Sequence, residues 1–167
     1  MALSIQLLEK SHSRTKFDCG HNLLNNYIKK QAGQDIRRDL SACFVIAEEK
    51  NVVLGYYTLS ANSIKKDDFP EALQKKLPFN YVDIPTILLG RLAIDNTIKG
   101  NGWGEFLLVD ALRRCLEISE SVGTLAVVVD PIDKIAQSFY EKYGFILLPG
   151  SGKMFIPLKT IKQLWIN

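Results

Sequence analysis

The chain has 167 residues, of which 47% are hydrophobic and 23% charged. These proportions are typical of a folded globular protein and exclude a disordered or membrane-embedded chain. A formal net charge of +3 allows an anionic partner without requiring one. We expect a single domain over residues 1–167 with a mixed α/β fold, in which helices flank a central mixed sheet.

The cysteines and histidines argue against disulfides and metals. Cys19, Cys43 and Cys115 are scattered and odd in number, which favours free thiols in a reducing cytosol. His12 and His21 have no metal-ligand spacing with them, so we expect no metal site. The N-terminal stretch turns polar too soon for a signal peptide, and no apolar run approaches the ~20 residues that cross a bilayer. We therefore expect a soluble, cytoplasmic protein without a membrane partner.

The N-terminal part predicts a strand, a helix and a hairpin. A short strand is expected over Ser4–Leu8, and apolar residues at helical spacing predict a helix over His21–Ala32. Gly33–Leu40 is polar and basic, and we expect a solvated loop there. Two runs rich in β-branched and aromatic residues, Cys43–Ala47 and Val52–Ala61, predict an antiparallel hairpin.

The middle of the chain predicts a charged excursion and then a phosphate site. Asn62–Asp83 contains two prolines and a helical segment at Glu71–Lys76. An apolar run bounded by Pro85 and Asp95 predicts a buried strand, and alternating glycines then precede an amphipathic helix that ends near Gly123. Glycines between a strand and a helix favour phosphate binding, because backbone N–H groups can approach the ligand and the helix N-terminus is partly positive.

The C-terminal part predicts one more strand–helix unit and a closing pair of strands. Thr124–Val129 is continuously apolar and is expected to be a covered strand. A helix is expected over Lys134–Tyr143, strands over Phe145–Leu148 and Met154–Leu158, and a last helical turn up to Trp165.

The residues after the glycines exclude a Walker loop. Gly104 is followed by Glu105 and Phe106, where that loop needs Gly-Lys-Ser/Thr. A dinucleotide-binding fold is also disfavoured, because its glycine fingerprint belongs near the start of successive βαβ units and this loop comes after a hairpin, past the middle of the chain.

Two motifs resemble those of the GNAT superfamily of acetyl-CoA-dependent N-acetyltransferases. Residues 99–104 match the family's Arg/Gln-x-x-Gly-x-Gly/Ala signature except at Lys99, and residues 136–145 resemble its late Ala-x-x-Phe-Tyr-x-x-x-Gly-Phe signature. The resemblance implies acetyl-CoA as co-substrate. It also implies that the residues that bind acetyl-CoA are Leu92, Ala93, Ile94, Lys99, Gly100, Asn101, Gly102, Trp103 and Gly104.

The same resemblance assigns chemistry to the strand and to one tyrosine. A backbone N–H within Leu92–Ile94 would donate to the thioester oxygen, and Tyr140 matches the family's tyrosine near the sulfur. A phenol with a pKa of about 10 stays protonated at pH 7 and can donate to a departing thiolate. The alternative is that Tyr140 packs in the core beside Phe139, and packing is what we expect of Tyr143. No general base is evident, which favours an α-amino acceptor, since its pKa of roughly 7.7–8.0 leaves part of it neutral at pH 7.

A narrower resemblance covers most of the chain. Phe17-x-Cys19-Gly20-x-x-x-Leu24-x-x-Tyr27, Gly55–Ser60 and Leu89–Asp95 resemble the GNAT toxins of bacterial type II toxin–antitoxin systems. This implies acetylation of the α-amino group of aminoacyl-tRNA, which blocks translation, with a ribbon–helix–helix antitoxin and a homodimer as partners. The alternatives are a GNAT enzyme for a small amine or a protein N-terminus, and a module that binds acetyl-CoA without turnover.

Basic residues are the candidates for tRNA contacts. Arg91 lies inside an apolar strand, where an arginine needs a partner, either a phosphate of the acceptor or a structural carboxylate. The other candidates occur as pairs that could neutralise phosphates, although a solvated surface role is the alternative for each of them. They are Lys29, Lys30, Arg37 and Arg38, followed by Lys65, Lys66, Lys75 and Lys76.

Overall fold

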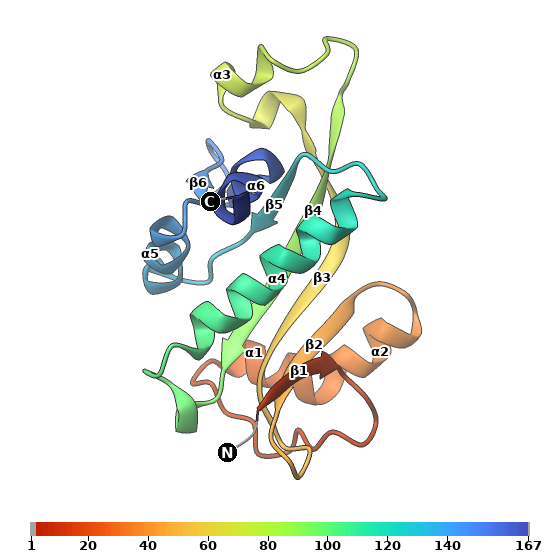
Figure 1. Cartoon of the computed structure of the whole chain (residues 1–167), viewed down its shortest axis with the longest axis vertical. Coiled ribbons are helices and arrows are strands. Elements are labelled where there is room, and N and C mark those ends of the chain that lie inside the picture. The colour runs from red at the N-terminus through yellow and green to blue at the C-terminus, as the bar shows by residue number, and fades with distance from the viewer. Residues whose placement is uncertain (1–2, 167) are drawn as a thin grey trace. The chain divides into compact units, whose positions relative to one another are not determined.

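The computed structural model describes residues 3–166, apart from the side chains of residues 165 and 166. The described strands form one mixed sheet in the order β1-β2-β3-β4-β5-β7-β6, with helices between them along the chain (Figure 1). The predicted mixed α/β class is therefore confirmed. Internal packing divides the chain into two compact units, 1–60 with 89–111 (unit 1) and 61–88 with 112–167 (unit 2).

Unit 1 contains the predicted hairpin and the first strand. β1 (Ser4–Leu7) pairs with β2 (Ala42–Ala47), which pairs in turn with β3 (Val53–Lys65), and both pairings are antiparallel. The register is irregular between Ile46 and Ala47, as at a β-bulge. The hairpin expected from the β-branched and aromatic runs is confirmed.

The helical segment of unit 1 is longer than its predicted range. α1 (Asn22–Asn26) continues into a π-helix, η1 (Tyr27–Gln31), and then into α2 (Ala32–Arg37), which lies beside β2 (Figure 1). The predicted helix is confirmed, but the predicted loop over Gly33–Leu40 is wrong. The Tyr27 hydroxyl donates to Asp35 Oδ2 at 2.8 Å, and Ala32 and Ile36 pack in the hydrophobic cluster, so tertiary contacts support a helix that glycine disfavours.

Two hydrophobic clusters of unit 1 lie on opposite faces of β4 (Asp83–Ile94). Ala93 packs with Phe17, Tyr27 and Tyr56. The next residue, Ile94, packs with Ile46, Leu54, Ile98 and Leu107. Because successive side chains of a strand point to opposite faces, odd-numbered residues of this part of β4 face the helical segment of residues 22–37.

Unit 2 is built around the parallel pair of β4 and β5 (Ala126–Val129). Their ladder joins residues 86–88 to residues 126–128, and β7 (Met154–Pro157) pairs antiparallel with β5. Every β5 residue is buried, as predicted from its continuous apolar run. The remaining elements of this unit are α5 (Lys134–Lys142), β6 (Ile146–Leu147) and α6 (Leu158–Ile166).

Several predicted boundaries in unit 2 are wrong. β3 continues to Lys65, and Asn62, predicted to begin the excursion, lies within it and donates from Nδ2 to Thr86 Oγ1 at 3.2 Å. β4 begins at Asp83. The segment that connects β3 to β4 is therefore shorter than predicted and contains η2 (Lys66–Asp68) and α3 (Glu71–Gln74) (Figure 1). α6 is a full helix where a last turn was predicted.

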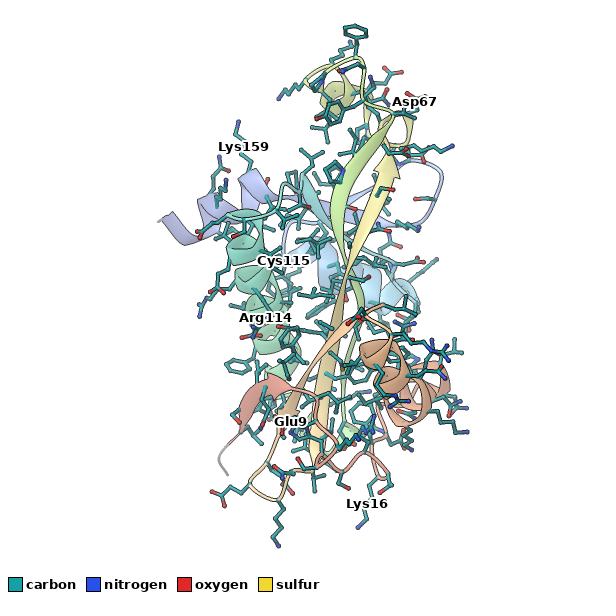
Figure 2. The ribbon with its side chains drawn as sticks, turned by 90° about the vertical axis from the view of Figure 1, so that its right-hand side faces the viewer. Glu9, Lys16, Asp67, Arg114, Cys115 and Lys159 are labelled. Carbon is teal, nitrogen blue, oxygen red and sulfur yellow. The ribbon has the colours of Figure 1, made fainter. Side chains whose placement is uncertain are left out.

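All three cysteines are free and buried. Burial raises the pKa of the Cys43 and Cys115 thiols to about 12 and also raises the pKa of Cys19. Cys115 lies on α4 (Trp103–Ser119), beside Arg114 in the sequence, as Figure 2 shows. Within the described part of the chain, no helix is long and apolar enough to cross a bilayer, and no cluster of ligand side chains could hold a metal ion.

Candidate functional site

The glycine loop at the end of β4 lies in unit 1. Asp95 and the short η3 (Asn96–Ile98) lead into the loop, and α4 begins at Trp103. Gly100 and Gly102 have φ values of +84° and +82°, and a Cβ at either position would meet no atom within 4 Å. The two glycines are therefore required by the backbone conformation, and the space around them is open to a ligand. Gly104, expected in the loop, lies in the first turn of α4.

The carboxylate of Asp95 fixes the start of this loop. Its Oδ1 accepts from the Thr97 N–H at 2.9 Å and from Thr97 Oγ1 at 2.7 Å, and its Oδ2 accepts from the Asp18 N–H at 2.9 Å. The Asn96 N–H donates to the Asp18 carbonyl at 2.8 Å. The loop is thus tied to the turn that precedes α1, and each hydrogen bond of this kind contributes about 1 kcal/mol.

Lys99, the residue that departs from the family signature, is engaged within the chain. Its Nζ donates a hydrogen bond to the Cys19 carbonyl. The turn at Gly20 has φ +89°, and a Cβ there would lie 3.6 Å from the same Nζ. Since this lysine is engaged with the 18–20 turn, the groups that the loop offers to an anion are its backbone N–H groups.

The other predicted cofactor residues surround this loop or precede it. Asn101 Nδ2 donates to the Ile98 carbonyl at 3.4 Å, and the Trp103 ring packs edge-on against Phe106 with 5.3 Å between centroids. Ala93 and Ile94 are buried, and Leu92 packs beside Ile94 in the same cluster as Trp103. These contacts belong to unit 1, so β4 and the loop form one packed element.

Arg91 stacks on an aromatic ring. Its Cζ lies 3.6 Å from the centroid of the Tyr27 ring, a cation–π contact worth about 0.5–2 kcal/mol. The sequence predicted a phosphate or a carboxylate as the partner of Arg91. Within the described part of the chain its partner is the face of Tyr27 and no carboxylate, because the helical segment of residues 22–37 packs on that side of β4, and the phosphate stays a prediction.

The Tyr27 ring is itself fixed on two sides. Its hydroxyl donates to Asp35, and its ring stacks on Tyr56 with 6.1 Å between centroids. Tyr56 donates in turn to the Leu24 carbonyl at 2.8 Å. Burial first, and then the Asp35 hydrogen bond, raise the pKa of Tyr27 to about 12, so its phenol remains a donor at neutral pH. Sequence reasoning missed Tyr27 and Asp35 as supports of Arg91, although Tyr27 stands in the toxin-like motif.

The remaining basic candidates are distributed over both units. Lys29 and Lys30 lie on η1, Arg37 ends α2 and Arg38 follows it, and all four are exposed. The pairs at residues 65–66 and 75–76 belong to unit 2, where Lys66 Nζ donates to the carbonyl groups of residues 78 and 79. The structure therefore gathers the first four on one helical segment.

Tyr140 lies on α5 in unit 2. Its side chain is 7% exposed, and burial alone raises the pKa of its phenol. Its ring lies 5.3 Å from that of Phe139 and 5.2 Å from that of Phe145, centroid to centroid. Tyr143 packs on Phe139 at 5.1 Å, so the packing expected of Tyr143 is confirmed. Asp133 caps the helix, since its Oδ1 accepts from the Ala136 N–H at 2.8 Å.

Comparison with known families and sequences gives consistent matches. The family model described as "Acetyltransferase (GNAT) family" matches residues 5–145. A relative from Mycobacterium tuberculosis, a tRNA-acetylating toxin, is 34% identical over 135 residues, which are 81% of this chain and 79% of the relative.

Solved structures of one toxin match along nearly all of the chain. AtaT complexed with acetyl-methionyl-tRNAfMet has a TM-score of 0.91 and 32% identity, covering 98% of this chain and 99% of AtaT. A tyrosine-to-phenylalanine mutant of AtaT, bound to the C-terminus of the antitoxin AtaR and to acetyl-CoA, has a TM-score of 0.84 and 29% identity, covering 100% of both chains.

Proposed function

The chain belongs to the acetyltransferase (GNAT) family, and we propose that it is an acetyl-CoA-dependent N-acetyltransferase toxin, as its relatives are named. The proposed reaction acetylates the α-amino group of aminoacyl-tRNA and thereby blocks translation. The relative named for acetylating tRNA and the AtaT complex with an acetylated aminoacyl-tRNA support this acceptor. The observation that carries the proposal is the open pair of left-handed glycines at the start of α4.

The residues of the loop fit the pyrophosphate of acetyl-CoA. Backbone N–H groups within Gly100–Gly104 and the positive end of a 17-residue helix suit a bound anion, and no Cβ at either left-handed glycine blocks the approach. Acetyl-CoA, when bound, supplies the thioester as the acyl donor. β4 pairs with β5 through residues 86–88 and extends beyond this pairing to Ile94. A backbone N–H within Leu92–Ile94 would donate to the thioester oxygen as negative charge develops.

We assign Tyr140 as the proton donor to the leaving sulfur. Burial raises the pKa of its phenol, so the Oη–H remains protonated across the physiological range and can donate a hydrogen bond to the departing thiolate as its charge develops. The acceptor amine, with a pKa of roughly 7.7–8.0, is already partly neutral at pH 7. The proposal therefore needs no carboxylate as general base.

The proposed partners are aminoacyl-tRNA, an antitoxin with a ribbon–helix–helix segment, and a second copy of the chain. Exposed Lys29, Lys30, Arg37 and Arg38 are proposed to neutralise tRNA phosphates in the cytoplasm, where charged tRNA is found. The complex of AtaT with the C-terminus of AtaR supports an antitoxin partner. Light scattering on the purified chain, alone and co-expressed with the antitoxin, measures both assemblies.

Labelled acetyl-CoA tests the acceptor. The protein is incubated separately with charged tRNA, polyamines and peptides, and we expect label on the α-amino group of aminoacyl-tRNA. Turnover of a small amine or peptide without label on any charged tRNA would contradict the toxin proposal. Binding of acetyl-CoA without turnover of any acceptor would indicate a binding module.

A further inference from the structure

Arg91 presents a guanidinium group whose hydrogen-bonding capacity the chain leaves unused. It is a half-buried residue of β4, held over the Tyr27 ring at 3.6 Å. Among the residues that the structure describes, no carboxylate or carbonyl accepts a hydrogen bond from it. Its N–H donors are therefore open to an acceptor that a ligand supplies.

The surroundings of Arg91 hold its side chain in one plane. Tyr27 is 4% exposed, its hydroxyl is bound to Asp35, and its ring is stacked on Tyr56. A guanidinium group that stacks by its face keeps its N–H donors at the edge, in a fork that matches two oxygens of a phosphate. Tyr27 is in this sense a positioning residue for Arg91.

Arg91 lies directly beside the backbone proposed to meet the thioester. It is on the same face of β4 as Ala93, the face that packs toward Tyr27 and Tyr56. At a rise of about 3.3 Å per residue, the Cα atoms of Arg91 and Ala93 are about 7 Å apart. An anion on the guanidinium would therefore lie on the same face of β4 as Ala93, within one strand repeat of the backbone proposed to meet the thioester.

We infer that Arg91, held flat against Tyr27, binds the 5′-phosphate of the terminal nucleotide of aminoacyl-tRNA. This inference rests on the proposed function. In that acceptor the amino acid is esterified to the last ribose, so this phosphate is the first anion reached along the covalent chain from the reacting amine. The contact is a charge-assisted, bidentate Arg–phosphate pair. A phosphate of acetyl-CoA has the same chemistry, and the experiment separates the two sources.

The test uses two minimal acceptors that differ by one phosphate. Both are hydrolysis-resistant 3′-aminoacylamido adenosines carrying the amino acid found in the charged-tRNA assay, one with a 5′-monophosphate and one without. We expect the wild type to prefer the phosphorylated acceptor about tenfold or more in kcat/KM. Arg91→Gln should bring this ratio close to one and leave the KM for acetyl-CoA unchanged.

Further variants separate positioning from folding. Tyr27→Phe keeps the ring and should keep the phosphate preference, whereas Tyr27→Leu removes the stack and should lower it. Lys50→Met, at an exposed position of the β2–β3 turn in the same unit, removes the same charge and should retain the wild-type ratio. Because each ratio is measured within one preparation, a smaller folded fraction cancels.

Three results would overturn the inference. An unchanged ratio in Arg91→Gln, or an effect that falls on the KM for acetyl-CoA, would show that Arg91 does not bind the acceptor phosphate. Failure of the proposed function has a different signature, since the wild type would then label no charged tRNA. If charged tRNA is labelled but the wild type ignores the 5′-phosphate, only the Arg91 inference fails.

Discussion

Single residues of this chain are constrained for different physical reasons, and the glycines show the contrast. Gly100 and Gly102 are needed for a left-handed backbone in open space. Position 55 has no space for a side chain, since a Cβ on Gly55 would lie 2.9 Å from Ile94 Cδ1 and 3.3 Å from both the Ala93 carbonyl and Leu107 Cδ1. The same residue type is thus required at the loop for conformation and under β4 for packing.

Gly55→Ala should therefore destabilise the protein. The added methyl group must displace Ile94 or the β4 backbone, and overpacking of this kind costs about 1–3 kcal/mol. Urea denaturation measures the loss. Gly123→Ala is the control, because its Cβ would meet nothing within 4 Å, and its effect should stay within about 1 kcal/mol. Equal midpoints for the two variants would contradict the packing argument.

Tyr140 carries the proposed proton transfer, and one hydroxyl tests it. Tyr140→Phe keeps the ring contacts with Phe139 and Phe145 and removes only the Oη–H. We expect kcat to fall by about 10²–10⁴ while the KM for acetyl-CoA is unchanged. Tyr143→Phe, on the same helix, should keep wild-type kcat. If Tyr140→Phe turns over normally, its role is packing alone.

At the scale of elements, the strand–loop–helix formed by β4 and α4 could be predicted because its signals are local. An apolar run, alternating glycines and helical spacing stand next to one another in the sequence. α2 could not, because Gly33 and the basic pair after it are typical of a loop. Ala32 and Ile36 pack this helix against the hydrophobic cluster of unit 1, and the local sequence does not reveal these contacts. The Arg91–Tyr27 stack was missed for the same reason, since only tertiary packing brings the two residues together.

The junction between β4 and the loop depends on Asp95. Asp95→Ala would leave the N–H groups of Asp18 and Thr97 without their acceptor, at a cost of about 1–3 kcal/mol each where they stay shielded from water. We expect a lower urea midpoint and a higher KM for acetyl-CoA, because the loop loses its anchor. Asp133→Ala, which removes the α5 cap, should lower stability and leave this KM unchanged. A wild-type KM in Asp95→Ala would show that the loop holds its conformation without the anchor.

At the scale of the whole molecule, buried acids that stay protonated make the fold sensitive to alkali. The pKa of Cys43 and Cys115 rises from an ordinary 9.0 to about 12 in the folded state. Above pH 9 the unfolded chain releases thiol protons that the folded chain retains. Stability is therefore complete below pH 9 and is lost as the pH rises toward 12.

This loss should be measurable as a slope. The free energy of unfolding should fall above pH 9 by about 1.4 kcal/mol per pH unit for each thiol. Cys43→Ala removes one titrating group and should make the decline shallower, whatever its effect on stability at pH 7. Urea denaturation at several alkaline pH values measures both slopes. Identical slopes for wild type and variant would rule out this thiol as a source.

The burial of the cysteines also makes the chain its own reporter of local opening. Cys19 and Cys43 belong to unit 1 and Cys115 to unit 2, and none is accessible in the folded state. A thiol reagent can modify each cysteine only when local unfolding exposes its thiol. Mass spectrometry of the modified peptides would then time the opening of the two units separately, without any introduced label. Adding acetyl-CoA or an acceptor would show which unit each ligand holds closed.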